Sequence, residues 1–165
     1  MIAETSRLTL RELTVDDAPF VLELVTDPSF VANIGDKGVH DLDAARRFIL
    51  EGQWTALQPP GHGQFLVECK ITGMAVGVCG VLYRERLGVS DVGCAFLPRF
   101  RGRGLALEAL RAVLEYARST LGLDEVVALT APHNQASLRI VGKLGMTYRR
   151  TVKMSDDDPG TLLYA

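Results

Sequence analysis

The sequence has few cysteines and few histidines, and neither set shows the spacing of a structural or catalytic site. Its three cysteines make an odd number without a CxxC pair, and its three histidines are dispersed: Cys69, Cys79, Cys94, His40, His62 and His133. The cysteines lie in apolar, strand-like stretches, which argues against a disulfide framework and favours buried, reduced thiols. No histidine lies at ligand spacing from another histidine or cysteine, so no metal site is expected.

An excess of positive charge and a long apolar run are also absent. Eighteen Lys and Arg residues against twenty Asp and Glu residues give a formal net charge of -2, so no surplus positive potential is available to hold a nucleic-acid backbone. The longest apolar stretch, residues 74–83, falls well short of the roughly 20 residues of a membrane-spanning helix. Residues 1–11 lack the pattern of a signal peptide. We therefore expect a soluble, cytoplasmic protein that binds neither nucleic acid nor membrane.

No internal repeat, low-complexity segment or Pro/Gly/Ser linker divides the chain. With 165 residues, of which 47% are hydrophobic and 23% charged, the chain is long enough to bury one proper core. We expect a single domain over residues 1–165.

Hydrophobic periodicity predicts about six to seven strands and about four helices. The strand patterns cover residues 7–12, 65–70, 74–83, 90–97, 126–130, 146–152 and 161–164. The helical patterns cover residues 15–25 after a Thr14 cap, and residues 41–57, 104–120 and 134–144. Residues 74–83 are apolar on both faces, which predicts a central strand. Because this order mixes hairpins with crossovers, we predict a mixed, twisted sheet in an α/β fold of the α+β type.

The most informative segment runs from Leu97 to Ala106, between a predicted strand and the most apolar predicted helix. It contains Gly102 and Gly104 directly before the helix. The free amides of a helix's first turn and the positive end of its dipole attract an anion, and glycines let a phosphate approach the backbone. Three arginines add positive charge to the segment: Arg99, Arg101 and Arg103. The segment is therefore a candidate diphosphate-binding loop.

An alternative interpretation of this segment is a tight strand-to-helix turn whose glycines serve only backbone geometry and whose arginines face solvent. Spacing alone does not decide between the two. The dinucleotide pattern GxGxxG fails because Leu107 stands where the third glycine belongs, and no GxxxxGK[ST] occurs. Neither NAD nor ATP is indicated as the ligand.

The same residues resemble a known motif. Arg99-x-x-Gly102-x-Gly104, and the overlapping Arg101-x-x-Gly104-x-Ala106, resemble the Q/R-x-x-G-x-G/A acyl-CoA loop of the GNAT superfamily of N-acetyltransferases. About thirty residues further on, residues 134–137 and 142–146 are similar to the N-x-x-S…K-x-G-F segment of that family, with Met146 in place of the usual Phe.

Two further segments extend the resemblance over almost the whole chain. Asp91-Val92-Gly93 resembles the E-I-G-Y strand that precedes the family's loop, although Cys94 stands where an aromatic residue is common. Thr5-Ser6-Arg7-Leu8-Thr9-Leu10-Arg11 resembles the T-x-R-L-x-L-R start of the branch that includes ribosomal-protein N-acetyltransferases. The fold implied is a single GNAT-like acyl-CoA-binding domain.

The resemblance implies an acetyl-CoA cosubstrate and an amine-bearing acceptor. Loop contacts to the diphosphate would come from Arg101, Gly102, Arg103, Gly104 and Ala106. Backbone groups of Phe96 and Leu97 would hold pantetheine, and Asn134 and Ser137 would lie beside the other end of that arm. The family reaction is direct attack of the amine on the thioester, with backbone amides stabilising the oxyanion.

A base must remove a proton from the acceptor, because an α-amine has a reference pKa of about 8 and lysine one of about 10.4. Asp91 occupies the position where the family often carries Glu, and its shorter side chain predicts action through a water. The alternative for Asp91 is a polar residue at a strand end. Glu68 and Glu85 are weaker candidates.

Ser137 matches the residue that in this branch donates a proton to the departing CoA thiolate. Because a thiolate of pKa about 8.5 already leaves readily, a hydroxyl that only bonds local backbone is an equal alternative for Ser137. Asn134 has its own alternative as a helix N-cap.

The leading prediction is an acetyl-CoA-dependent N-acetyltransferase that acts on a protein N-terminal α-amine or a small-molecule amine. The alternative from another class is a CoA-binding sensor or interaction module without strong catalysis, and a third is a domain without any ligand. Relatives often continue beyond the position of Ala165, so a second subunit of a homodimer is a candidate for one wall of the acceptor site.

Overall fold

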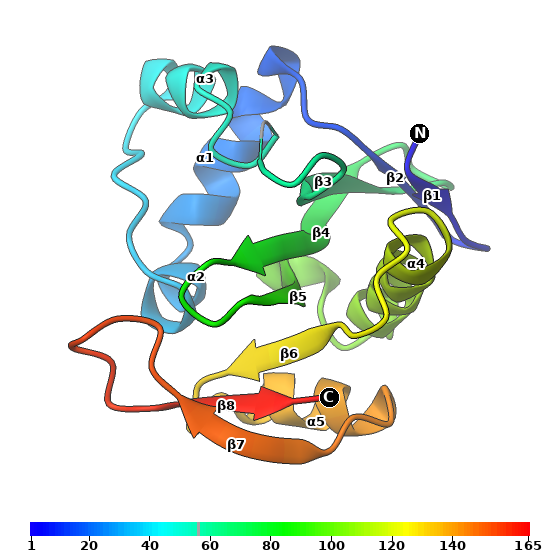
Figure 1. Cartoon of the computed structure of the whole chain (residues 1–165). Coiled ribbons are helices and arrows are strands. Elements are labelled where there is room, and N and C mark those ends of the chain that lie inside the picture. Colours follow the sequence, from blue (N-terminus) through cyan, green and yellow to red (C-terminus); the bar gives the residue numbers. More distant parts are fainter. Residues whose placement is uncertain (56) are drawn as a thin grey trace.

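An eight-stranded mixed sheet organises the computed structural model, which describes residues 1–55 and 57–165 (Figure 1). The strands are β1 (Ala3–Glu4), β2 (Leu8–Arg11), β3 (Gly63–Cys69), β4 (Ala75–Arg84), β5 (Val89–Phe96), β6 (Val127–Thr130), β7 (Tyr148–Val152) and β8 (Thr161–Tyr164). The helices are α1 (Ala18–Thr26), α2 (Pro28–Asn33), α3 (Leu42–Leu50), α4 (Leu105–Ser119) and α5 (Gln135–Lys143), with short 3-10 turns at Val15–Asp17 and Pro98–Phe100.

The spatial order β1-β2-β3-β4-β5-β6-β8-β7 confirms the predicted mixed sheet. Strands β5 and β6 are parallel, and every other neighbouring pair is antiparallel. The predicted central strand is confirmed as β4, because Val78 packs into the core on one face and Val81 into the core on the other. The additional strand is β1, whose two residues are too few to show an alternating pattern.

The helices differ from the prediction at two places. The Asp27-Pro28 step that ends α1 also begins α2, because the Asp27 carboxylate accepts a hydrogen bond from Phe30 N and proline suits a first helical position. The helix predicted over residues 41–57 ends at Leu50, before Gly52 with its left-handed φ of 73°. Ala56, within that predicted range, lies outside the described residues.

Helices cover both faces of the sheet (Figure 1). Helices α1, α2 and α3 pack over one core, which contains Leu66 and Leu97. Helix α4 packs over the other, which contains Val92 and Phe96. Residues of β5 and the position after it therefore alternate between the two cores, as predicted.

The polar residues of α4 form the predicted narrow stripe, with Arg111, Glu115 and Arg118 exposed and Glu108 half-buried.

The crossover β5–α4–β6 determines where the candidate site lies. Because β5 and β6 are parallel, their carboxyl ends meet at the same edge of the sheet. Helix α4 begins after one strand and α5 after the other, so both helix N-termini lie at this edge. Ligands of sheets with parallel strands commonly bind at such an edge.

Candidate active site

Strands β5 and β6 stay paired over a short distance only. Their ladder contains two residue pairs, Asp91 with Val127 and Val92 with Ala128. Beyond Val92, β5 continues to Phe96 beside β4, whereas β6 pairs with β8. The two parallel strands therefore separate, and the edge of β5 that faces β6 is left open.

The register of β4 against β5 shows which backbone groups face that open edge. Leu97 N donates to Val76 O at 3.0 Å. Because backbone groups alternate in direction along a strand, the N–H and C=O groups of Ala95 and Gly93 also point toward β4. Phe96 and Cys94 direct theirs toward the opening. Leu97 O accepts from Phe100 N at 3.0 Å.

Both backbone groups of Leu97 are thus already bonded within the protein, which corrects the expectation that they are offered to a ligand. Phe96 keeps its predicted place at the open edge. Cys94 is a second residue whose backbone groups face the opening, and the sequence interpretation did not name it. The alternation of the strand could have identified Cys94 once the hydrogen-bonded partner of Leu97 was known.

The loop before α4 has the conformation that its glycines predict. Gly102 and Gly104 have left-handed φ values of 75° and 76°, and a Cβ added at Gly102 would meet nothing within 4 Å. The first helical amide with a backbone partner is that of Glu108, which donates to Gly104 O at 3.1 Å. The amides of residues 105–107 have no hydrogen-bond partner in the described part of the chain. These free donors form the kind of terminus that binds anions.

The three arginines of the loop point in different directions. Arg99 forms an ion pair with Glu23 of α1. Arg101 donates from Nε to Phe96 O at 3.0 Å, and its Nη2 lies 3.6 Å from Asp27 Oδ2. Arg103 is exposed and has no ion pair with any residue that the structure describes. Arg103 is therefore the arginine of the loop with an uncommitted charge.

The start of α5 lies at the same edge as the loop. Asn134 Oδ1 accepts from Ser137 N at 3.2 Å, so the N-cap interpretation of Asn134 is confirmed. Ser137 is half-buried in the first turn. The fold thus gathers both sequence blocks, residues 96–106 and residues 134–137, at the carboxyl ends of β5 and β6.

Asp91 is the buried carboxylate next to the point where β5 and β6 separate. It is 3% exposed, and Arg84 Nε donates to its Oδ1 at 2.7 Å. Burial raises the pKa of Asp91, and the charge and hydrogen bond of Arg84 oppose this rise without cancelling it. The other two carboxylates lie elsewhere, because Glu68 pairs with Arg11 on β2 at 2.7 Å and Glu85 is exposed in the β4–β5 turn.

The thiols of Cys79 and Cys94 are unsuited to act as nucleophiles. All three cysteines are free, but only Cys79 is fully buried, whereas Cys69 and Cys94 are half-buried. Burial raises the pKa of Cys79 and raises the pKa of Cys94 to about 12. A protonated thiol is a poor nucleophile, so these two side chains do not suggest an acyl-enzyme.

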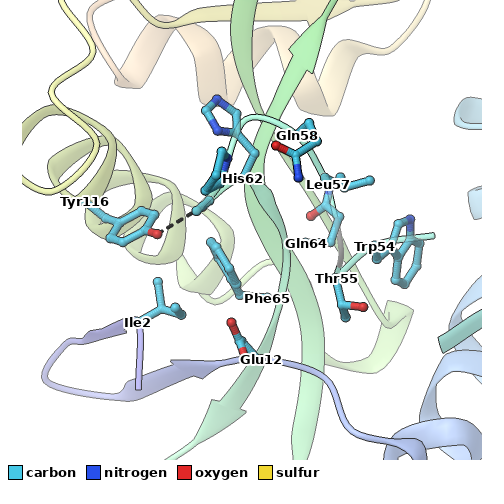
Figure 2. A pocket seen from close by; sticks show the side chains of 12 residues that line it. Ile2, Glu12, Trp54, Thr55, Leu57, Gln58, His62, Gln64, Phe65 and Tyr116 are labelled. Carbon is cyan, nitrogen blue, oxygen red and sulfur yellow. Dashed lines mark hydrogen bonds between the residues drawn. The ribbon is translucent and has the colours of Figure 1, made fainter. Parts of the chain in front are cut away.

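Two hollows lie at opposite ends of the sheet. One of about 320 Å³ borders the loop and is lined by Glu23, Thr26, Asp27, Leu97, Pro98 and Arg99. The other, of about 200 Å³, lies between Trp54, Phe65 and Tyr116 (Figure 2). There Tyr116 donates to Gly61 O at 3.0 Å. None of the predicted site residues lines this second hollow, so it is separate from the loop.

Residues 1–55 and 57–165 contain no cluster of three or more His, Cys, Asp or Glu side chains that could hold a metal ion. Nor does this part of the chain contain a helix with the length and hydropathy needed to cross a membrane.

The chain resembles known proteins over nearly its full length. A family model described as "Acetyltransferase (GNAT) domain" matches residues 7–147. "Uncharacterized protein YkkB" of Bacillus subtilis is 30% identical over 154 residues, covering 90% of this chain and 87% of that protein.

Solved structures agree with this family. A GNAT-family acetyltransferase from Bacillus anthracis has a TM-score of 0.80 at 21% identity, covering 98% of this chain and 95% of the other. RimL, a ribosomal L7/L12 α-N-protein acetyltransferase in complex with coenzyme A, has a TM-score of 0.78 at 19% identity, covering 99% and 95%. The separated parallel strands, the glycine loop and the family match lead to one conclusion: the chain belongs to the GNAT family of acetyltransferases and is an acyltransferase.

Proposed function

We propose that this chain transfers the acetyl group of acetyl-CoA to a primary amine, either a protein N-terminal α-amine or a small-molecule amine, by direct attack. The main support for the proposal is that two sets of free backbone N–H groups lie at the same edge of the sheet. One set lies on the open edge of β5, and the other lies in the first turn of α4. An α-amine acceptor is also supported by RimL, whose printed name describes an α-N-protein acetyltransferase.

The residues at this edge fit an acyl-CoA molecule. The amides at the start of α4, beside Gly102 and Gly104, would bind the two phosphates, and Arg103 would add a charge-assisted contact. The N–H of Phe96 faces the opening and would bond the pantetheine arm. Ala106 lies in the first turn of α4, where its small side chain leaves the approach open.

Arg101 has a different role in this arrangement. Its Nε–H donates a hydrogen bond to the Phe96 carbonyl, and its Nη2 lies near the carboxylate of Asp27. Arg101 would therefore fix the end of β5 and reach a phosphate only by leaving one of these partners. Asn134 and Ser137 would border the arm from the α5 side.

When bound, acetyl-CoA supplies an activated thioester. The chain must supply a proton acceptor, because a protonated amine does not attack. Asp91 would take that proton through a water, since its short side chain is buried against Arg84. A backbone N–H on the open edge of β5 would polarise the carbonyl that the amine attacks.

Acetyl-CoA binding and turnover can be measured separately. At a hundredfold excess over Kd, the ligand should add about 2.7 kcal/mol to the free energy of unfolding. For a chain of this size, that corresponds to a rise in Tm of about 5–10 °C. Release of free CoA thiol in the presence of amines or peptides measures turnover. No shift in Tm would contradict the proposed binding, and a shift without thiol release across the panel would identify a binding module.

Replacing Ser137 with alanine should lower kcat by less than about tenfold, because a thiolate of pKa about 8.5 leaves without much acid assistance. The Asn134 cap uses the Ser137 amide and not its hydroxyl, so the substitution leaves α5 intact. Steady-state thiol release at pH 7 and 9 measures the effect. A loss above a hundredfold at both pH values would mean that the hydroxyl has a larger role than proton donation to the thiolate.

A further inference from the structure

The turn between β1 and β2 makes a dense set of contacts with the first turn of α4. Glu108 Oε1 accepts hydrogen bonds from Thr5 Oγ1 at 2.5 Å and from Arg7 N at 3.1 Å. Glu108 Oε2 lies 2.6 Å from both Nε and Nη2 of Arg7. Two guanidinium nitrogens of Arg7 therefore contact one carboxylate oxygen, while Thr5 and the Arg7 amide bind the other, and together these contacts fix the direction of both side chains.

The same guanidinium group also reaches the loop. Arg7 Nη1 donates to Arg103 O at 3.0 Å. The C=O and N–H of a trans peptide point in opposite directions, so this bond directs the N–H of Gly104 away from the N-terminal hairpin. Arg7 thereby connects the helix carboxylate to the peptide bond that enters the left-handed Gly104.

The charges of this cluster are balanced. Burial alone would raise the pKa of Glu108, but the hydrogen bonds from Thr5 and Arg7 lower it, so the carboxylate is ionised at neutral pH. Its negative charge lies in the first turn of α4, where an anionic ligand is expected, and the Arg7 guanidinium neutralises it. The Thr5–Arg7 segment therefore has an electrostatic and a geometric connection to the loop.

We propose that Arg7 is a positioning residue for acetyl-CoA. Its guanidinium group binds the Arg103 carbonyl and the Glu108 carboxylate at the same time, and so sets the direction of the loop amides. This inference rests on the proposed function and assigns a role to the Thr5-x-Arg7 pair at the start of the chain. Arg7 acts through the loop. Its loss should weaken acetyl-CoA binding without changing the chemical step.

The test is the Arg7→Met variant, studied by calorimetric binding of acetyl-CoA and by steady-state kinetics. We expect Kd and KM for acetyl-CoA to rise about tenfold, while kcat and KM for the acceptor stay within twofold. Arg7→Lys keeps the charge but lacks the planar fork, so its Kd should still rise at least fivefold. The double variant Arg7→Met/Glu108→Gln removes both charges. It should bind acetyl-CoA as weakly as Arg7→Met, because the Arg103 carbonyl still lacks its hydrogen bond from Arg7.

A matched control is Lys70→Met, which removes the 2.5 Å ion pair between Lys70 Nζ and Glu4 Oε1 at the same hairpin without touching the loop. Its Kd should equal that of the unmodified protein. Equal acetyl-CoA affinity of Arg7→Met and the unmodified protein would overturn the inference. Full recovery of acetyl-CoA affinity in the double variant would also overturn it, because the effect of Arg7→Met would then come from the unpaired Glu108 charge. If the unmodified protein does not bind acetyl-CoA, the proposed function fails instead.

Discussion

Gly104→Val should raise the Kd for acetyl-CoA at least about a hundredfold. Gly104 is the N-cap of α4 and has a φ of 76°, which a β-branched residue adopts only with strain. The valine backbone would relax by rotating the peptides on either side and so turn the loop amides away from the diphosphate. Each hydrogen bond to a charged group contributes about 1.5–3 kcal/mol, so the loss of two reaches this magnitude.

The control for backbone strain is Gly122→Val. Gly122 lies after the other end of α4, has a φ of 68°, and has nothing within 4 Å of an added Cβ. Both valine variants should lose a comparable amount of Tm, but only Gly104→Val should lose binding. Isothermal titration with acetyl-CoA measures both. Unchanged affinity in Gly104→Val would mean that the glycines serve only the turn, and the proposed diphosphate loop would have to be abandoned.

Asp91→Asn should lower kcat about a hundredfold at neutral pH, the usual contribution of a positioned base. Asparagine retains an oxygen that accepts the hydrogen bond from Arg84 Nε, so the buried contact survives and the KM for acetyl-CoA should not change. Because burial raises the pKa of Asp91, the rate of the unmodified protein should fall as the pH drops through a value above the usual aspartate range.

The pH profile separates a base from a structural carboxylate. The difference between Asp91→Asn and the unmodified protein should narrow as the pH passes the pKa of the acceptor, about 8 for an α-amine, since the amine then loses its proton to solvent. Glu85→Gln, in the exposed turn of the same hairpin, is the control and should leave the profile unchanged. A constant ratio of rates at every pH would exclude proton removal by Asp91.

Local signals in the sequence were sufficient for most of the fold. The strand over residues 161–164 and the cap at Asn134 are where the pattern placed them, because alternation and capping depend on residues within a few positions. The capping box of Thr14 and Asp17 is confirmed too, although a 3-10 turn precedes α1. The glycine spacing located the loop for the same reason, since a left-handed φ is a property of single residues.

Contacts between distant segments could not be predicted from local sequence signals. Arg7 and Glu108 are 101 positions apart, and Arg99 and Glu23 are 76 apart, so no window of sequence contains either pair. The direction of the Leu97 amide depends on its hydrogen bond to Val76 O on β4, a residue 21 positions away that no pattern within residues 90–97 contains. The sequence therefore located the loop but could not show which of its arginines is free of other ion pairs in the described part of the chain.

The short ladder between β5 and β6 has a consequence for stability. Continuing their pairing to the ends of both strands would add hydrogen bonds that each contribute about 0.5–1.5 kcal/mol to the free energy of unfolding, so the protein would be more stable. It would also close the gap at which we propose that acetyl-CoA binds, since the N–H groups now free on β5 would donate to carbonyl oxygens of β6. Variants selected only for heat resistance should therefore tend to lengthen this ladder beyond Val92 and Ala128 and lose turnover as they do so.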